Sequence, residues 1–125
     1  MENAGYTRVL DFWFGAPGSA IRGRPRAEWF RKSDVFDAQI RDRFLGLYER
    51  ARRHELVEWR VSPLSLLALI IVCDQFPRNM FRDSPRAFES DGIALDGARR
   101  MTAMHWDDRL NAHERQFAYL PFEQI

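Results

Sequence analysis

The feature that most constrains the fold is an apolar run at residues 64–73 of this 125-residue chain. Ser62 and Pro63 precede it, and serine is a good N-cap while proline suits the first helical position. The run is apolar on nearly all sides, which predicts a helix from Pro63 to about Gln75 at the centre of a bundle. Residues 70–72 would also suit a buried strand, but no partner strand or hairpin signal exists, so the helix is favoured.

The segments around this run have helical periodicity. A stripe at residues 6–14 predicts a helix that Gly15 ends, followed by a mobile loop over about residues 15–25. A short turn or helix at residues 26–30 should then carry Trp29 and Phe30 inward. Ser33 is a suitable N-cap for a long helix, on which Asp37–Arg41 and Glu49–Arg53 are expected to form i,i+4 ion pairs. The inward face of this helix comprises Phe36, Ile40, Phe44, Leu47, Tyr48 and Ala51.

The second half of the chain repeats these signals. Pro77 predicts a bend after the central helix, Ser84-Pro85 opens another helical segment, and Asp91 offers a further start. Asn111 begins a sequence that resembles a capping box and opens a last helix, which Pro121 should end. We therefore predict one all-α domain over residues 1–125, a right-handed array of five to six helices without a sheet. Its least exposed residues should include Trp13, Phe44, Leu66, Leu69, Ile70, Cys73 and Phe76.

Composition excludes several function classes. The net charge of +1 gives no reason to expect nucleic acid, and the longest apolar run is half of the ~20 residues that a membrane helix needs. The first residues lack a signal peptide, so a soluble, cytoplasmic protein is expected. His54, His105 and His113 lack the spacing of a zinc helix, and a weak cluster of His105 with Asp107 and Asp108 is better explained as a polar loop. We predict neither a metal nor a cofactor.

The candidate binding site follows the central helix directly. Polar residues placed beside an apolar core cost roughly 1–3 kcal/mol each if unpaired, so they are either mutually satisfied or held for a ligand. One interpretation is a pocket in which arginine clamps an anion, and the other is a hydrogen-bonded cluster that locks the bend. Asp74 is expected to pair with Arg78 or Arg82. The candidate residues are Asp74, Gln75, Arg78, Asn79 and Arg82, and none is assigned a catalytic role.

The same segment carries a resemblance to a known family. The chain resembles the bacterial family called domain of unknown function 924, whose members look like tetratricopeptide-type helical proteins. The motif Asp-Gln-Phe-Pro-Arg-Asn at residues 74–79 is specific to the family, and the similarity runs over nearly the whole chain. The other matching pieces are residues 9–15, 29–30, 36–37, 56–59, 69–82, 84–88 with Asp91, 114–115 and 119–123. The resemblance implies a fold but brings no established reaction.

The resemblance also implies that this is a shortened member. The family typically continues after Pro-Phe-Glu with His-Ser-Glu and further helices, whereas Gln124 and Ile125 follow here. Loss of those helices would uncover an apolar layer, so a homodimer is expected. The alternative is that the tail folds back onto its own core and leaves a polar monomer surface. The candidate contact is Phe117, Tyr119, Leu120 and Phe122.

Two functions remain open from the sequence. The first is a non-enzymatic interaction module for a partner protein, which tetratricopeptide-like architecture implies by analogy. The alternative is a small-molecule or anion-binding protein, or an enzyme, that uses the polar cluster at residues 74–82. The side-chain contacts of that cluster distinguish the two.

Overall fold

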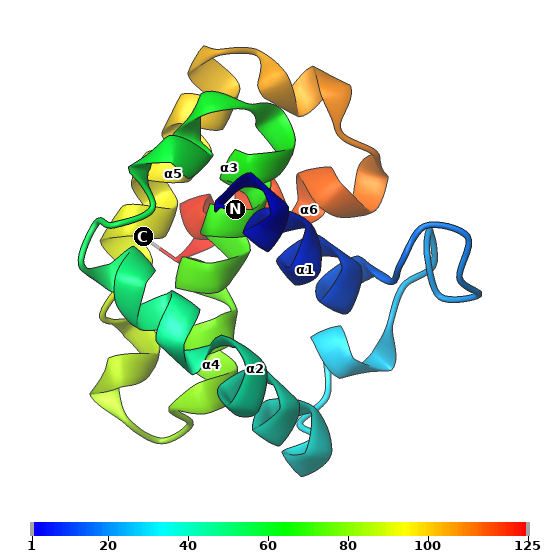
Figure 1. Cartoon of the computed structure of the whole chain (residues 1–125), viewed down its shortest axis with the longest axis vertical. Coiled ribbons are helices and arrows are strands. Elements are labelled where there is room, and N and C mark those ends of the chain that lie inside the picture. Colours follow the sequence, from blue (N-terminus) through cyan, green and yellow to red (C-terminus); the bar gives the residue numbers. More distant parts are fainter. Residues whose placement is uncertain (1, 125) are drawn as a thin grey trace.

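The computed structural model describes residues 2–124, and within this range it contains helices and no strand (Figure 1). The prediction of an all-α fold is therefore confirmed. The α-helices are α1 (Glu2–Phe14), α2 (Asp34–Arg52), α3 (Pro63–Asp74), α4 (Phe76–Met80), α5 (Asp91–Ala103) and α6 (Ala112–Glu123). Single 3-10 turns lie between them: η1 (Ala27–Trp29), η2 (Val57–Val61), η3 (Pro85–Phe88) and η4 (Trp106–Arg109).

Helix α3 is the centre of the structure, as its apolar sequence predicts. Ten of its twelve residues are buried, and it packs against α1, α2, α5 and α6 (Figure 1). Pro63 stands at its first turn, where a missing N–H costs nothing. Gly97 of α5 faces α3 so closely that a Cβ there would lie 3.0 Å from Cγ1 of Ile70. The absence of a side chain at Gly97 thus sets how near α5 approaches the central helix.

The core contains the seven residues predicted to be among the least exposed, namely Trp13, Phe44, Leu66, Leu69, Ile70, Cys73 and Phe76. Aromatic side chains dominate one part of this core, where the ring of Trp13 contacts Trp29, Phe76 and Phe117 at centroid distances of 5.4–6.4 Å. Such contacts add about 0.5–1.5 kcal/mol per pair beyond area burial. This aromatic cluster joins α1, η1, α4 and α6, which are distant in sequence.

Two of the expected helix starts are confirmed in atomic detail. The hydroxyl of Ser33 accepts the N–H of Phe36 (3.2 Å) at the start of α2. Asn111 and Glu114 exchange both bonds of a capping box at the start of α6, at 2.9 and 2.8 Å. Ser62 differs, because its hydroxyl contacts Ser65 rather than a backbone N–H.

The predictions for Phe30 and Pro121 are wrong. Phe30 is 63% exposed, because η1 turns only Trp29 inward, where its indole donates to the carbonyl of Trp13 (3.0 Å). Pro121 lies inside α6 instead of ending it. Proline removes one donor but its φ is helical, so a last turn still forms and is closed by Gln124 N–H on the Pro121 carbonyl (3.2 Å).

The two expected i,i+4 ion pairs on α2 are also replaced by other contacts. Asp37 faces α4 rather than Arg41, whose guanidinium lies over the Phe81 ring instead. Glu49 accepts from Arg52 (2.9 Å) and from Arg86 of η3. Arg53 donates to Glu55 (3.0 Å). Exposed helix pairs contribute only about 0.3–0.5 kcal/mol, so contacts with other elements override them easily.

The aromatic tail is mostly folded onto its own domain. Phe117 is buried among Trp13, Phe14 and Trp29, so its inclusion in a surface for self-association is wrong. Leu120 and Phe122 are half-buried, and Tyr119 donates to Asp107 (2.6 Å). The homodimer itself stays a prediction. Within residues 2–124, no helix has both the length and the apolar character required to cross a bilayer.

Candidate functional site

The candidate site lies at the junction of α3 and α4, and the break between them falls at Gln75. Pro77 was expected to bend the chain at Phe76, but Phe76 is already helical and the proline occupies the first turn of α4. That position needs no backbone donor, so proline is compatible with it. One residue therefore separates the two helices at this junction, and Asp74 and Arg78 lie on neighbouring turns.

Asp74 is the most deeply buried charge of the site, with 1% of its surface exposed. Its carboxylate accepts from the side-chain amide of Gln75 (2.7 Å) and lies 3.5 Å from Nη1 of Arg78. The same Nη1 donates to the backbone carbonyl of Asp74 (2.5 Å), which satisfies a carbonyl at the end of α3. The expected pairing of Asp74 with an arginine is confirmed, and Arg78 is the partner.

Burial raises the pKa of Asp74 above its ordinary value of 3.8. The Gln75 amide and the Arg78 charge act in the opposite direction, and the nearby charge of Asp91 adds to the rise. Desolvation is the largest of these effects because the carboxylate lies where water does not reach. Asp74 is thus a costly buried charge that its neighbours only partly compensate.

Arg78 makes its best ion pair with a residue outside the predicted set. It binds Asp91 of α5 through two parallel hydrogen bonds, Nη1 to Oδ1 at 2.8 Å and Nη2 to Oδ2 at 3.0 Å. Its guanidinium also lies over the ring of Phe88, 5.1 Å from the centroid. These contacts fix Arg78 between α3, η3 and α5.

Asn79 and Arg82 form a second group, held by α2. The amide of Asn79 donates to Asp37 (2.9 Å), and Arg82 binds the same carboxylate through Nε (2.5 Å) and Nη2 (3.2 Å). The five predicted residues are therefore not one cluster. They are divided into one group that ties α3 and α4 to α5 and another that ties α4 to α2.

Sequence reasoning missed Asp37 and Asp91 as members of the site. Asp37 was assigned to a pair on its own helix, and Asp91 only to a helix start. Both are among the residues that carry the family resemblance, and that was the signal that could have identified them. Their separations from their partners, 42 and 13 residues, leave no local pattern to read.

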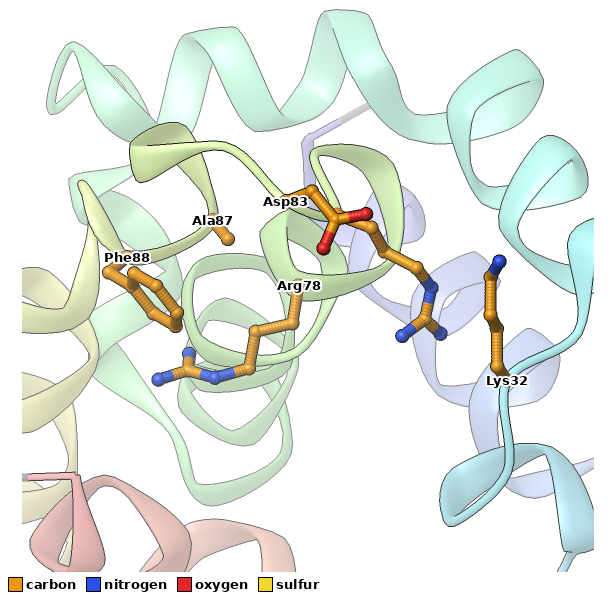
Figure 2. Close-up of a pocket in the computed structure, with 6 residues that line it drawn as sticks. Lys32, Arg78, Asp83, Ala87 and Phe88 are labelled. Carbon is orange, nitrogen blue, oxygen red and sulfur yellow. The ribbon is translucent and has the colours of Figure 1, made fainter.

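A surface hollow of about 500 Å³ lies beside these two groups (Figure 2). We call it the basic hollow, because three cationic side chains and one acidic one line it together with Ala87 and Phe88. In Figure 2, Lys32 projects from the segment before α2, and Phe88 lies at the opposite end beside Arg78. Phe88 is 59% exposed. The charged lining residues are Lys32, Arg78, Arg82 and Asp83.

Two further open hollows share Lys32 with the basic hollow. One, of about 250 Å³, runs along η1 and is lined by Ala27, Glu28, Arg31 and Ser33. The other, of about 410 Å³, lies between α2 and α4 and also shares Arg82. Lys32 thus stands where three depressions meet, and the surface between η1 and η3 is grooved rather than flat.

Two other reactive side chains, Cys73 and His105, do not line the basic hollow. Cys73 is fully buried, and burial raises the pKa of its thiol to about 12, so it stays protonated at neutral pH. His105 has a left-handed backbone conformation, φ 57°, between the C-cap of α5 and the start of η4, which agrees with a loop position. Within the described residues, no group of three or more His, Cys, Asp or Glu side chains is placed to hold a metal ion.

Comparison with known proteins gives a family and one solved relative. The model of the family described as bacterial protein of unknown function (DUF924) matches residues 9–125. The structure of a protein of unknown function, Atu0120 from Agrobacterium tumefaciens, is similar with a TM-score of 0.88 and 32% identity. The alignment covers 100% of this chain and 66% of that one, so this chain spans about two thirds of its relative's length. No curated protein matches the sequence significantly.

Proposed function

The chain belongs to the DUF924 family of bacterial proteins of unknown function, which brings no activity with it, and we propose that it is a non-enzymatic interaction module. Its binding surface is the groove that passes over Lys32, and its ligand is an acidic, extended segment of a partner protein. The observation that carries this proposal is that three adjoining hollows share one exposed lysine.

The shape of the groove favours an extended chain over a small molecule. Small-molecule sites are concave and bury most of their ligand. The hollows around Lys32 are open and continue from η1 past α4 to η3. A peptide lying along them would pass Lys32 at the centre and reach the exposed ring of Phe88 at one end.

Five basic and four acidic residues line the three hollows, and the charge that favours an acidic ligand is that of Lys32, where the hollows meet. Lys32 is 66% exposed, and its nearest acid, Asp34 at 3.6 Å, is 89% exposed, so this ion pair is weak and easily exchanged. Arg78 and Arg82 are already positioned by Asp91 and Asp37. Because their charges are paired with these carboxylates, Arg78 and Arg82 shape the groove, and Lys32 supplies its exchangeable positive charge.

The alternative from the sequence, a small-anion site inside the Asp74–Arg82 cluster, receives less support. The carboxylate of Asp74 and the guanidinium groups of Arg78 and Arg82 are all engaged with other protein groups. An anion entering the cluster would have to displace Asp37 or Asp91. We therefore assign the cluster a positioning role and place the ligand on its outer side.

The proposal is tested by fluorescence anisotropy with a fluorescein-labelled hexaglutamate peptide and a hexaglutamine peptide as the uncharged control. We expect hexaglutamate to bind and hexaglutamine not to bind. Lys32→Glu should weaken binding by about fivefold or more, because it replaces an attraction with a repulsion. Binding should also weaken as salt is raised, since the groove is exposed to solvent.

Arg24→Glu is the matched control, because it makes the same change of net charge at an exposed site outside the three hollows. Equal losses in Lys32→Glu and Arg24→Glu would show that only net charge matters and would refute the groove. Binding of inorganic phosphate in competition with the peptide, at similar affinity, would favour the small-anion alternative instead.

A further inference from the structure

A separate hollow of about 510 Å³ lies between the C-terminal end of α2 and the first turns of α5. We call it the α2–α5 hollow. A smaller recess of about 40 Å³ adjoins it and shares three of its lining residues, His54, Arg60 and Ile93. The remaining walls of this recess are mostly apolar and comprise Ala51, Leu56, Val57 and Leu69.

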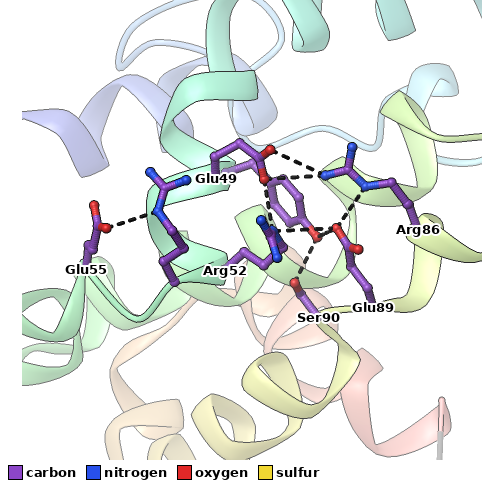
Figure 3. A network of polar contacts seen from close by, with 8 residues as sticks. Glu49, Arg52, Glu55, Arg86, Glu89 and Ser90 are labelled. Atoms are coloured by element: carbon purple, nitrogen blue, oxygen red, sulfur yellow. Dashed lines mark hydrogen bonds and ion pairs between the residues drawn. The ribbon is translucent and has the colours of Figure 1, made fainter.

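The rim of the α2–α5 hollow carries balanced charges. Two arginines, Arg52 and Arg60, face two carboxylates, Glu89 and Asp96. Arg60 contacts Asp96 directly, and Nε of Arg52 lies 3.9 Å from Glu89. Figure 3 shows Arg52 and Glu89 approaching each other from α2 and from the segment before α5. These groups are paired within the protein, Arg52 also with Glu49 (2.9 Å) and Glu89 also with Tyr48 (2.7 Å). A ligand of one sign would take one partner and leave the opposite group unpaired, whereas a zwitterion exchanges both partners at once.

The recess limits the apolar part of the ligand. A cavity needs about 10–15 Å³ to hold one water molecule, which has a single non-hydrogen atom. A recess of about 40 Å³ therefore holds about three non-hydrogen atoms. This is the size of an isopropyl group. Its floor includes Leu69 of the central helix, which is nearly buried, so an apolar group there would be shielded from water.

From this geometry we propose that the α2–α5 hollow binds a free aliphatic α-amino acid of about the size of valine. The isopropyl group enters the recess, the carboxylate faces Arg60 and Arg52, and the ammonium faces Asp96 and Glu89. A free amino acid carries both charges on one carbon, whereas a peptide terminus carries only one of them. The balanced rim therefore selects the free form.

Gly92 provides a way to close this hollow without disturbing the fold. It lines the hollow on α5, and a Cβ built there meets no atom within 4 Å. Gly92→Phe should thus fill the hollow from the solvent side. Gly46→Phe is the matched control, because Gly46 is likewise exposed, helical and free of contacts at its Cβ, but lies on α2 outside the hollow.

The test is a titration of ¹⁵N-labelled protein with L-valine, followed by amide chemical shifts. We expect saturable shifts at Val57, Gly92 and Ile93 that persist in Gly46→Phe and disappear in Gly92→Phe. Glycine, 3-methylbutanoate and isobutylamine, which lack the side chain, the amine and the carboxylate respectively, should each bind at least about tenfold more weakly.

The proposal is overturned if no amide shifts up to about 50 mM L-valine, a concentration that would largely fill even a ~10 mM site. It is also overturned if isobutylamine or 3-methylbutanoate binds as well as valine, or if Gly92→Phe binds valine unchanged. Because the hollow is distinct from the groove around Lys32, each of these outcomes is independent of the peptide-binding test.

Discussion

Arg78 holds Asp91 through two parallel hydrogen bonds of 2.8 and 3.0 Å, while its guanidinium lies 3.5 Å from the carboxylate of Asp74, which is closer to it in sequence. Asp91 is the first residue of α5, where the helix dipole stabilises a negative charge. This ion pair therefore fastens the junction of α3 and α4 to the start of α5. It also explains why a polar segment follows the most apolar helix of the chain.

The Arg78–Asp91 pair should be strongly coupled in stability. In a double-mutant cycle with Arg78→Met and Asp91→Ala, we expect a coupling free energy of about 1–3 kcal/mol, because the contact is bidentate and largely shielded. Urea unfolding of the four proteins measures it. A coupling near zero would mean that the pair only reflects proximity.

Asp74 should give stability a defined dependence on pH. Its pKa is raised above 3.8 in the folded state, so the folded chain binds this proton more tightly than the unfolded chain. We compare the free energy of unfolding of the wild type with that of Asp74→Asn. The wild type should be most stable relative to the variant below the unfolded-state pKa of Asp74, and this advantage should fall as the pH rises through the folded-state pKa. Parallel urea titrations from about pH 3 to 7 measure the difference. A difference that grows with pH would show that the Gln75 hydrogen bond and the Arg78 charge together outweigh burial.

The helices could be predicted from the sequence because their signals are local. The caps at Ser33 and Asn111 and the apolar run of α3 lie within a few residues of what they determine. The partners in the site could not be predicted, because Asp37 and Asp91 meet their arginines only after the helices pack. The grooved surface around Lys32 was missed for the same reason, since three separate segments create it.

Gly97 should be intolerant of larger side chains. A Cβ there would lie 3.0 Å from Ile70 and 3.4 Å from Leu66, so Gly97→Val forces α5 away from α3. We expect a loss of about 1–3 kcal/mol by overpacking. Gly46→Val is the control, and it should stay within about 0.5 kcal/mol of the wild type because nothing surrounds that position. Equal stability of the two variants would contradict the close approach of the helices.

Replacing His105 with glycine should increase the stability of the folded protein. Its backbone is left-handed (φ 57°), a conformation that costs side-chain-bearing residues about 1–2 kcal/mol and glycine little. We expect His105→Gly to stabilise the protein by roughly 0.5–1 kcal/mol in thermal or urea unfolding. Met104→Gly, one residue earlier at φ −86°, should instead destabilise it. A loss of stability in His105→Gly would reveal a contact of the imidazole that outweighs the strain.

Lys32 is the one lysine in the 125-residue sequence, and this makes the central claim directly measurable. Reductive methylation with ¹³C-formaldehyde labels Lys32 and the α-amino group, and the latter serves as an internal reference in NMR spectra. On titration with hexaglutamate, the account predicts a saturable shift of the Lys32 dimethyl signal, with hexaglutamine producing none. Peptide binding that leaves the Lys32 signal unmoved would contradict the groove as the binding surface.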